Sequence, residues 1–138
     1  MPPHVLFLCI HNAGRSQMAA GWLRHLAAGR IDVSSAGSEP ADSPNPAAVE
    51  AMREVGIDIA AQVPERWTDE ALKTVDLVVT MGCGDECPVY PDTQYLDWPV
   101  ADPSGQSVAV VRPIRDDLKR RIEGLIEMLT DSTVPAEA

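Results

Sequence analysis

The chain has 138 residues, of which 45% are hydrophobic, so it is long enough for one compact core and too short for two ordinary domains. Its formal net charge of -10 repels phosphate backbones and anionic lipid surfaces, and we therefore expect neither nucleic acid nor a membrane as a partner. The three cysteines are an odd number, which argues against a disulfide framework and leaves redox, catalytic or metal chemistry open, beside simple burial as small apolar side chains.

The first expected element is a buried strand at residues 4–10, which form an apolar run close to the N-terminus. This run is too short to span a bilayer and lacks the basic start and the cleavage site of a signal peptide, so we expect a cytoplasmic protein. A loop that contains glycine follows, and then apolar residues recur at helical spacing at Met18, Trp22, Leu23 and Leu26. The beginning of the chain therefore predicts a strand, a loop and a helix.

The middle of the chain repeats this alternation. Residues 31–35 predict a second strand, and Asn45 with Pro46 predicts a helix start, with the asparagine as cap and the proline at the first helical position. Thr68, which two acidic residues follow, predicts another helix start. Residues 77–81 form a continuous apolar strand of the kind found inside parallel sheets.

The last expected element is an amphipathic helix that begins near Pro113. Its apolar residues recur on one face, at Ile114, Leu118, Ile122, Leu125 and Leu129. Residues from 132 onward are small, polar or proline and are expected to fray. We therefore expect one α/β domain over residues 1–131 and a disordered tail over residues 132–138.

The loop between the first strand and the first helix carries the clearest chemical signal. Cys9 stands at the end of the strand, and Arg15 stands where the helix begins. A loop that curls onto a helix N-terminus can bind a tetrahedral oxyanion through unpaired N–H groups, and the same field favours the nucleophilic thiolate. The arginine adds a planar fork that suits two oxygens. The candidate oxyanion-binding residues are Ile10, His11, Asn12, Ala13, Gly14, Arg15 and Ser16.

This spacing of cysteine and arginine is a short pattern with many accidental matches. The alternative is a buried cysteine beside an arginine that only pairs with surface carboxylates. The position between a strand and a helix favours the oxyanion interpretation. Ser16 could donate to the thiolate or cap the helix, and His11 could be a solvated side chain or a general base.

Several segments together resemble the low-molecular-weight tyrosine phosphatases and the arsenate reductases built on that fold. These segments are the loop from Cys9 through Ala19, Ser35-Ala36-Gly37, Asn45-Pro46 and Gly56-Ile57-Asp58-Ile59. The resemblance spans most of the chain. It implies a single-domain three-layer sandwich, in which helices flank a four-stranded parallel sheet and a phosphate-binding loop follows the first strand.

The same resemblance implies a general acid at Asp102, which precedes Pro103. Asp102 would protonate the oxygen that leaves the central atom when Cys9 attacks. By itself, Asp-Pro is a common turn dipeptide. Ser104 and Gly105 follow it here, where the phosphatases usually have tyrosines that wall an aromatic pocket.

Residues 81–88 resemble the redox segment of thiol-dependent arsenate reductases, and they contain Cys83 and Cys87. The implied activity is the reduction of arsenate to arsenite for arsenic detoxification. In the implied cycle, Cys9 attacks arsenic and Cys83 then forms a disulfide with Cys9. Cys87 next attacks Cys83, which gives a Cys83–Cys87 disulfide. An external thioredoxin-type reductant or a low-molecular-weight thiol would restore the enzyme, and we expect no bound cofactor and no metal.

Three departures from the family pattern affect this transfer. Gly14 occupies the position of a second loop cysteine, so no disulfide can form inside the loop. Ala20 aligns with a glutamate that helps some of these reductases to bind potassium, so we do not predict that ion. Cys83 and Cys87 are closer in sequence than in the best-known thioredoxin-linked members, and the order in which they react stays open.

Other functions remain open at this stage. A small thiol could take the arsenic from Cys9 alone, or the chain could be a tyrosine phosphatase of the same fold, or a reductase with weak phosphatase activity. A non-enzymatic alternative is an oxyanion-binding module with a structural zinc held by Cys83, Cys87 and either His11 or His25, although the spacing of these residues is a weak match to known zinc sites.

Overall fold

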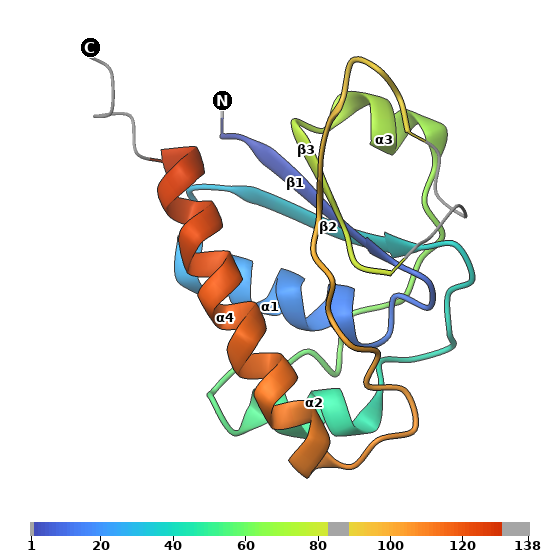
Figure 1. The fold of residues 1–138 in the computed structure, drawn as a ribbon, viewed down its shortest axis with the longest axis vertical. Helices are drawn as coiled ribbons and strands as arrows, with labels where there is room; N and C mark the ends of the chain where they lie inside the picture. Colours follow the sequence, from blue (N-terminus) through green and yellow to red (C-terminus); the bar gives the residue numbers. More distant parts are fainter. Residues whose placement is uncertain (1, 83–88, 131–138) are drawn as a thin grey trace.

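The structure is a computed structural model, and it describes residues 2–82 and 89–130. Helices cover both faces of a parallel sheet, as Figure 1 shows. The elements follow in the order β1 (His4–Cys9), α1 (Arg15–Ala27), β2 (Asp32–Gly37), α2 (Pro46–Arg53), α3 (Asp69–Thr74), β3 (Leu77–Thr80), β4 (Gln94–Asp97) and α4 (Val108–Thr130). The predicted α/β fold with a four-stranded parallel sheet is confirmed.

The order of the strands places β1 inside the sheet. The order is β2-β1-β3-β4, and all neighbouring pairs are parallel. In this register His4 lies beside Asp32, and Cys9 lies beside Gly37. The carboxyl ends of the strands therefore meet at one edge of the sheet, where open α/β folds bind their ligands. Cys9 is the last residue of β1 and lies at this edge.

Alternation along β1 divides the core between the two faces of the sheet. Val5, Phe7 and Cys9 belong to the larger cluster, which also contains buried residues of α1, α2 and α4. Leu6 and Leu8 belong to a smaller cluster on the α3 side. Side chains that alternate along a strand point to opposite faces of the sheet, so these two clusters make the fold three layers deep.

Two of the predicted helix starts are confirmed by their capping hydrogen bonds. Oδ1 of Asn45 accepts from the backbone N–H groups of Ala47 at 2.8 Å and Ala48 at 3.3 Å. Oγ1 of Thr68 accepts from the N–H of Ala71 at 3.0 Å. Each cap satisfies donors that the first turn of a helix leaves unpaired.

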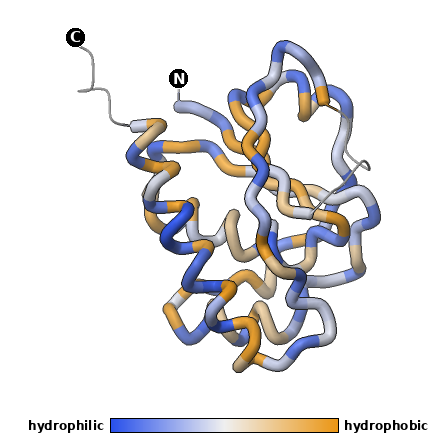
Figure 2. Tube along the Cα trace, in the orientation of Figure 1, coloured by the Kyte–Doolittle hydropathy of each residue, from blue (hydrophilic) through white to orange (hydrophobic). Residues whose placement is uncertain are grey.

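The predicted start of the last helix near Pro113 is wrong, because α4 begins at Val108 and contains this proline. The N–H groups of Val110 and Val111 both donate to the carbonyl of Ser107, which forms the first turn, and Val111 is fully buried in the core. Burial of this valine holds the extra turn, and the proline removes only one hydrogen bond near the helix start. The predicted amphipathic character of α4 is confirmed, and hydrophobic and hydrophilic residues alternate along it in Figure 2.

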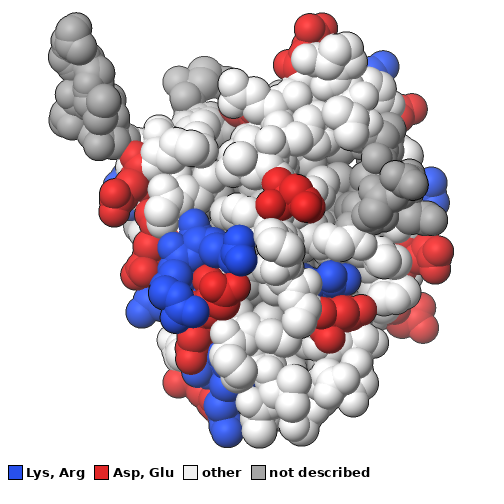
Figure 3. Space-filling model, in the orientation of Figure 1, with Lys and Arg blue, Asp and Glu red and all other residues white. Residues whose placement is uncertain are grey.

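Among the described residues, no helix is long and apolar enough to cross a bilayer. In Figure 3, Lys and Arg side chains adjoin Asp and Glu side chains at the lower left, and much of the rest of this face is uncharged. The predicted tail at residues 132–138 lies outside the described residues.

Candidate active site

The loop between β1 and α1 is held by the segment that follows β2. Three of its carbonyls accept backbone hydrogen bonds, from Glu39 N to Ile10 O at 2.8 Å, from Ala41 N to His11 O at 2.9 Å and from Asn45 N to Ala13 O at 2.9 Å. A carbonyl and the N–H that follows it point in opposite directions in a trans peptide. The N–H groups after these carbonyls therefore face the other side of the loop, which we call the cradle; together with the N-terminus of α1 this arrangement suits an oxyanion.

Asn12 fixes the middle of the loop with its side chain turned inward. Its φ angle is 51°, in the left-handed region, and its side chain is fully buried. Oδ1 of Asn12 accepts from the N–H of Glu65 at 2.9 Å, and its carbonyl accepts from Nε2 of Gln17 at 2.8 Å. Asn12 therefore shapes the cradle, and only its backbone can contribute to the oxyanion site.

The same asparagine orients the hydroxyl of Ser16. Because Oδ1 of Asn12 accepts from a backbone N–H, its Nδ2 is the group that faces Ser16, and it donates to Oγ of Ser16 at 2.7 Å. That oxygen lies 2.9 Å from Sγ of Cys9. The asparagine leaves the single hydroxyl hydrogen of Ser16 unused, so the hydroxyl can donate it to Cys9 whenever the sulfur is a thiolate, which has no hydrogen of its own. Of the two roles predicted for Ser16, the structure favours the donor to sulfur, and α1 has no side-chain cap.

Arg15 and Asp102 meet beside the cradle. The side chain of Arg15 is 7% exposed, and its Nη2 lies 3.7 Å from Oδ2 of Asp102, whose side chain is 47% exposed. Nη1 of Arg15 donates to the carbonyl of Val100 at 3.2 Å. The other carboxylate oxygen of Asp102 accepts from the N–H of Ser104 at 3.0 Å. A buried cation and an accessible acid therefore lie on the same side of the loop.

Asn45 joins the cradle to the loop that carries Asp102. In addition to its capping bonds, it donates from Nδ2 to the carbonyl of Pro103 at 3.3 Å, while its own N–H donates to Ala13. The two loops also touch at Gly14, where an added β-carbon would lie 2.6 Å from Cγ of Pro103. Sequence reasoning gave Asn45 only the role of a cap, because no local pattern reveals a bond to Pro103.

A cavity of about 800 Å³ opens above the cradle. Cys9 lies in its lining and is 2% exposed. The walls are formed by residues between 41 and 47 and between 102 and 108, and none of the described residues that line the cavity is Phe, Tyr or Trp. The cavity therefore brings together Cys9, Arg15 and Asp102, and its described lining has no Phe, Tyr or Trp ring on which an aryl group could stack.

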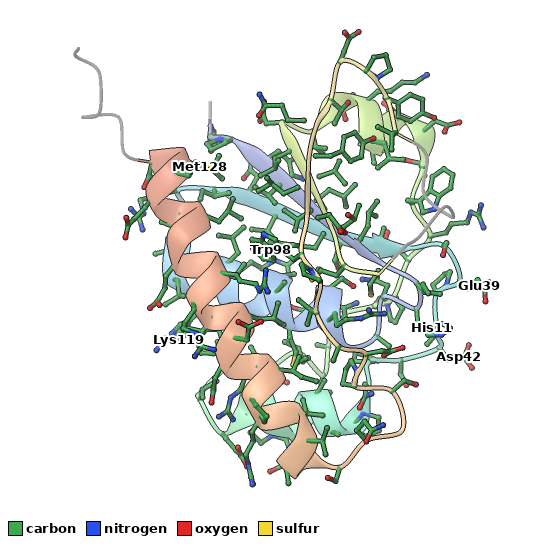
Figure 4. All side chains as sticks on the ribbon, viewed as in Figure 1. His11, Glu39, Asp42, Trp98, Lys119 and Met128 are labelled. Atoms are coloured by element: carbon green, nitrogen blue, oxygen red, sulfur yellow. The ribbon has the colours of Figure 1, made fainter. Side chains whose placement is uncertain are left out.

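His11 lies at the rim of this cavity. Its Nδ1 lies 3.1 Å from the carbonyl oxygen of Glu39, and Figure 4 shows His11 beside Glu39 and Asp42 at one edge of the molecule. The backbone of His11 also accepts a bond from Ala41. These contacts support a role for His11 in holding the loop, and they give no support to a general base.

Comparisons with known proteins agree with this geometry. Residues 4–134 match the family described as low molecular weight phosphotyrosine protein phosphatase. The chain belongs to this family. The resemblance drawn from the sequence is thereby confirmed.

The proteins that this chain resembles include several arsenate reductases. A glutaredoxin arsenate reductase from Synechocystis sp. is 40% identical over 129 residues, which cover 91% of this chain and 98% of the relative. A structure of a thioredoxin-dependent arsenate reductase from Corynebacterium glutamicum has a TM-score of 0.82 at 40% identity, and the match covers 95% of this chain but only 63% of the other. Another structure, of an arsenate reductase in the phosphate binding state, has a TM-score of 0.81 at 38% identity, with 93% and 99% covered.

The structure of this family member leaves two predicted site residues undescribed. Cys83 and Cys87 lie outside the described residues, so Cys9 is the free cysteine that the described part contains. Within that part no cluster of three or more His, Cys, Asp or Glu side chains could hold a metal ion. The zinc interpretation depends on the two undescribed cysteines and stays a prediction.

Proposed function

We propose that the chain is an arsenate reductase in which Cys9 attacks the arsenic of a bound arsenate. The observation that carries this proposal is the contact of Sγ of Cys9 with the Ser16 hydroxyl at the base of the cavity, beside Arg15 and Asp102. Backbone N–H groups and the Arg15 fork suit the oxygens of a tetrahedral dianion. A thiolate that receives a hydrogen bond is held in place to act as the nucleophile.

The first step forms a bond between sulfur and arsenic. Cys9 attacks arsenic, one arsenic–oxygen bond breaks, and the departing oxygen leaves as water after it receives a proton from Asp102. Asp102 is suited to this role because its carboxylate is accessible from the cavity and lies beside the arginine that would hold the substrate. Arsenic keeps its oxidation state in this step.

The second step transfers the electrons. A second thiolate, which we assign to Cys83, attacks the sulfur of Cys9, so that a disulfide forms and the sulfur–arsenic bond breaks. The electron pair of that bond stays with arsenic, which leaves as arsenite. Cys87 then attacks Cys83 and releases Cys9, and an external dithiol reduces the resulting Cys83–Cys87 disulfide. This assignment of Cys83 and Cys87 rests on the sequence alone.

The external reductant is proposed to be of the thioredoxin type. The relatives name two classes of reductant, since one is a thioredoxin-dependent and another a glutaredoxin arsenate reductase. In the alternative route a small thiol takes the arsenic from Cys9, and Cys83 and Cys87 take no part. Either route needs free thiols, which are maintained in the reducing cytoplasm, and we propose that location.

A tyrosine phosphatase function is the second candidate, because the family profile carries that name. The absence of Phe, Tyr and Trp among the described residues of the cavity wall favours a small oxyanion over an aryl phosphate. Ser104 and Gly105, which follow the Asp-Pro pair, belong to that wall. We therefore expect phosphatase activity to be weak.

The test is an arsenite-release assay with the purified protein, supplied in turn with thioredoxin and its reductase, with glutathione and glutaredoxin, and with no thiol. Multiple turnovers with thioredoxin alone support the proposed cycle. Turnover that requires the small thiol supports the alternative route. If no donor supports arsenite release while zinc is bound in stoichiometric amount, the enzyme assignment is wrong and the oxyanion-binding module replaces it.

A further inference from the structure

The backbone that leaves β3 passes close to the guanidinium of Arg15 at Gly82. The N–H of Met81 donates to the carbonyl of Leu8 at 2.8 Å, so pairing with β1 continues past the end of β3. Gly82 follows with a φ angle of 85°, in the left-handed region that favours glycine. This residue therefore reaches the sheet edge at which Cys9 and Arg15 lie.

Gly82 has no room for a side chain on the side of Arg15. An added β-carbon would come closest to Nη1 of Arg15 and would lie 3.1 Å from Cζ and 3.4 Å from Nη2. All of these atoms belong to the guanidinium. The approach of this added β-carbon to Nη1 is closer than non-bonded atoms allow, so the guanidinium of Arg15 would have to move.

The guanidinium is also held from other directions. Its Nη1 donates to the carbonyl of Val100 at 3.2 Å, and its Nη2 lies 3.7 Å from Oδ2 of Asp102. The side chain is 7% exposed, and these contacts fix the orientation that it has in the structure. Displacement by a β-carbon at Gly82 would therefore break the bond to Val100 or turn the fork away from the cradle.

We propose that Gly82 is a positioning residue for oxyanion binding, which acts by setting the orientation of the Arg15 guanidinium. The inference rests on the proposed function to the extent that Arg15 binds the oxyanion. A charged, bidentate contact depends on the plane of the fork, because both donors must point at the same anion. The end of a flexible side chain gives way more easily than the backbone, so a side chain at this position should weaken binding more than it weakens the fold.

Two variants at Gly82 separate a clash from backbone strain. Gly82→Ala adds the β-carbon and strains the left-handed backbone, whereas Gly82→Asn adds the same β-carbon with a residue that tolerates this region better. Gly56 provides the matched control, because its φ angle is 83° and an added β-carbon there would meet nothing within 4 Å. Gly56→Ala and Gly56→Asn therefore reproduce the strain without the contact.

The measurement is the dissociation constant of inorganic phosphate by titration calorimetry, together with the thermal midpoint of each variant. Both Gly82 variants should bind phosphate about tenfold more weakly than the wild type, the scale of one lost hydrogen bond to a charged group. Both Gly56 variants should bind as the wild type does, and each Gly82 variant should melt within a few degrees of its Gly56 counterpart.

Three results would overturn the inference. Phosphate affinity in the Gly82 variants equal to that of the Gly56 variants would remove the role of the contact. Normal affinity in Gly82→Asn with weak affinity in Gly82→Ala would assign the effect to backbone strain. Failure of both Gly82 variants to fold would show that the added β-carbon disrupts the backbone and does not simply displace the arginine fork. These outcomes are independent of turnover: a wild type that binds phosphate and does not reduce arsenate refutes the proposed function and leaves the Gly82 comparison intact.

Discussion

The hydroxyl oxygen of Ser16 lies 2.9 Å from the sulfur of Cys9, and it accepts from the side chain of Asn12, so its hydrogen is available to a thiolate at Cys9. We predict that Ser16→Ala slows alkylation of Cys9 by iodoacetamide at neutral pH by about tenfold, the scale of a hydrogen bond to a charged group. The thiolate loses a donor in this variant, and the cradle backbone stays in place. The rate is measured by mass spectrometry on a Cys83→Ser, Cys87→Ser background.

Ser38 is the matched control for this prediction, because it is another buried serine and its Oγ has no hydrogen-bond partner in the described structure. Ser38→Ala should leave the alkylation rate of Cys9 unchanged. Equal rates in Ser16→Ala and Ser38→Ala would show that the hydroxyl of Ser16 does not assist the thiolate.

Asn45 combines a capping role with a link between loops, and two substitutions separate these roles. Asn45→Ala should lower the free energy of unfolding by about 1 kcal/mol through loss of the cap. Asn45→Ser keeps a good capping residue, and its short hydroxyl does not reach the carbonyl of Pro103, so its stability should stay near that of the wild type. Both variants should slow formation of arsenite in a single turnover, because the Asp102 loop loses its tie to the cradle.

Chemical denaturation measures the stability of both Asn45 variants, and single-turnover kinetics measures their rate of arsenite formation. A rate loss in Asn45→Ala alone would mean that the cap matters and the bond to Pro103 does not.

The ion pairs between α2 and α4 predict an acid-dependent loss of stability. Hydrogen bonds from Arg112 and then from Arg115 lower the pKa of Glu54 from its ordinary value of 4.5 to about 2. A carboxylate with a lowered folded-state pKa stabilises the fold fully above its unfolded pKa, and this contribution is lost as the pH falls toward the folded pKa. The thermal midpoints of Glu54→Gln and wild type should therefore differ most at a pH above the ordinary pKa of 4.5. They should converge as the pH falls toward the lowered pKa of about 2.

Glu50 serves as the control because it forms an exposed pair with Arg53 on the same helix at 3.1 Å. Glu50→Gln should follow the wild-type pH profile closely, as exposed pairs contribute little. A constant difference between Glu54→Gln and wild type across the acid range would contradict the linkage.

The parts of the fold that depend on local patterns could be predicted from the sequence. The caps at Asn45 and Thr68 involve neighbours within three residues, and β1 is a continuous apolar run. The start of α4 was misplaced because proline is common at the first helical position, and the burial of Val111 depends on tertiary packing. The short strand β4 has no clear alternation, with its ends exposed and its centre half-buried, and only the family resemblance implied a fourth strand.

The candidate site also has parts that the sequence predicts and parts that only the structure shows. The sequence places Cys9 and Arg15 together because one loop carries both, and the structure brings Asp102 to them across the sheet edge. The bond from Asn45 to Pro103 and the contact of Gly82 with Arg15 join residues far apart in the chain, and no spacing rule could reveal them. The sequence places Gly82 only in the segment that resembles a redox segment, and the proximity of Gly82 to Arg15 appears only in the structure.

The order of the cysteines gives a further prediction that rests on the sequence of residues 82–87. If Cys83 attacks first, Cys87→Ser treated with arsenate and no reductant should release one equivalent of arsenite and accumulate a Cys9–Cys83 disulfide. Peptide mapping identifies the disulfide. Cys83→Ser is the paired variant, and a Cys9–Cys87 disulfide with stoichiometric arsenite in that variant would reverse the order. Full multiple turnover of both variants with a small thiol would remove Cys83 and Cys87 from the cycle.

The most direct test of the central claim compares Cys9→Ser with the wild type in two measurements on the same preparations. One is the release of arsenite from arsenate with thioredoxin and its reductase, and the other is the binding of inorganic phosphate by calorimetry. We predict that Cys9→Ser releases no arsenite above background and still binds phosphate, because the backbone cradle and Arg15 do not depend on the sulfur. Arsenite release near the wild-type rate in Cys9→Ser would contradict the account, because the nucleophile would then be another residue.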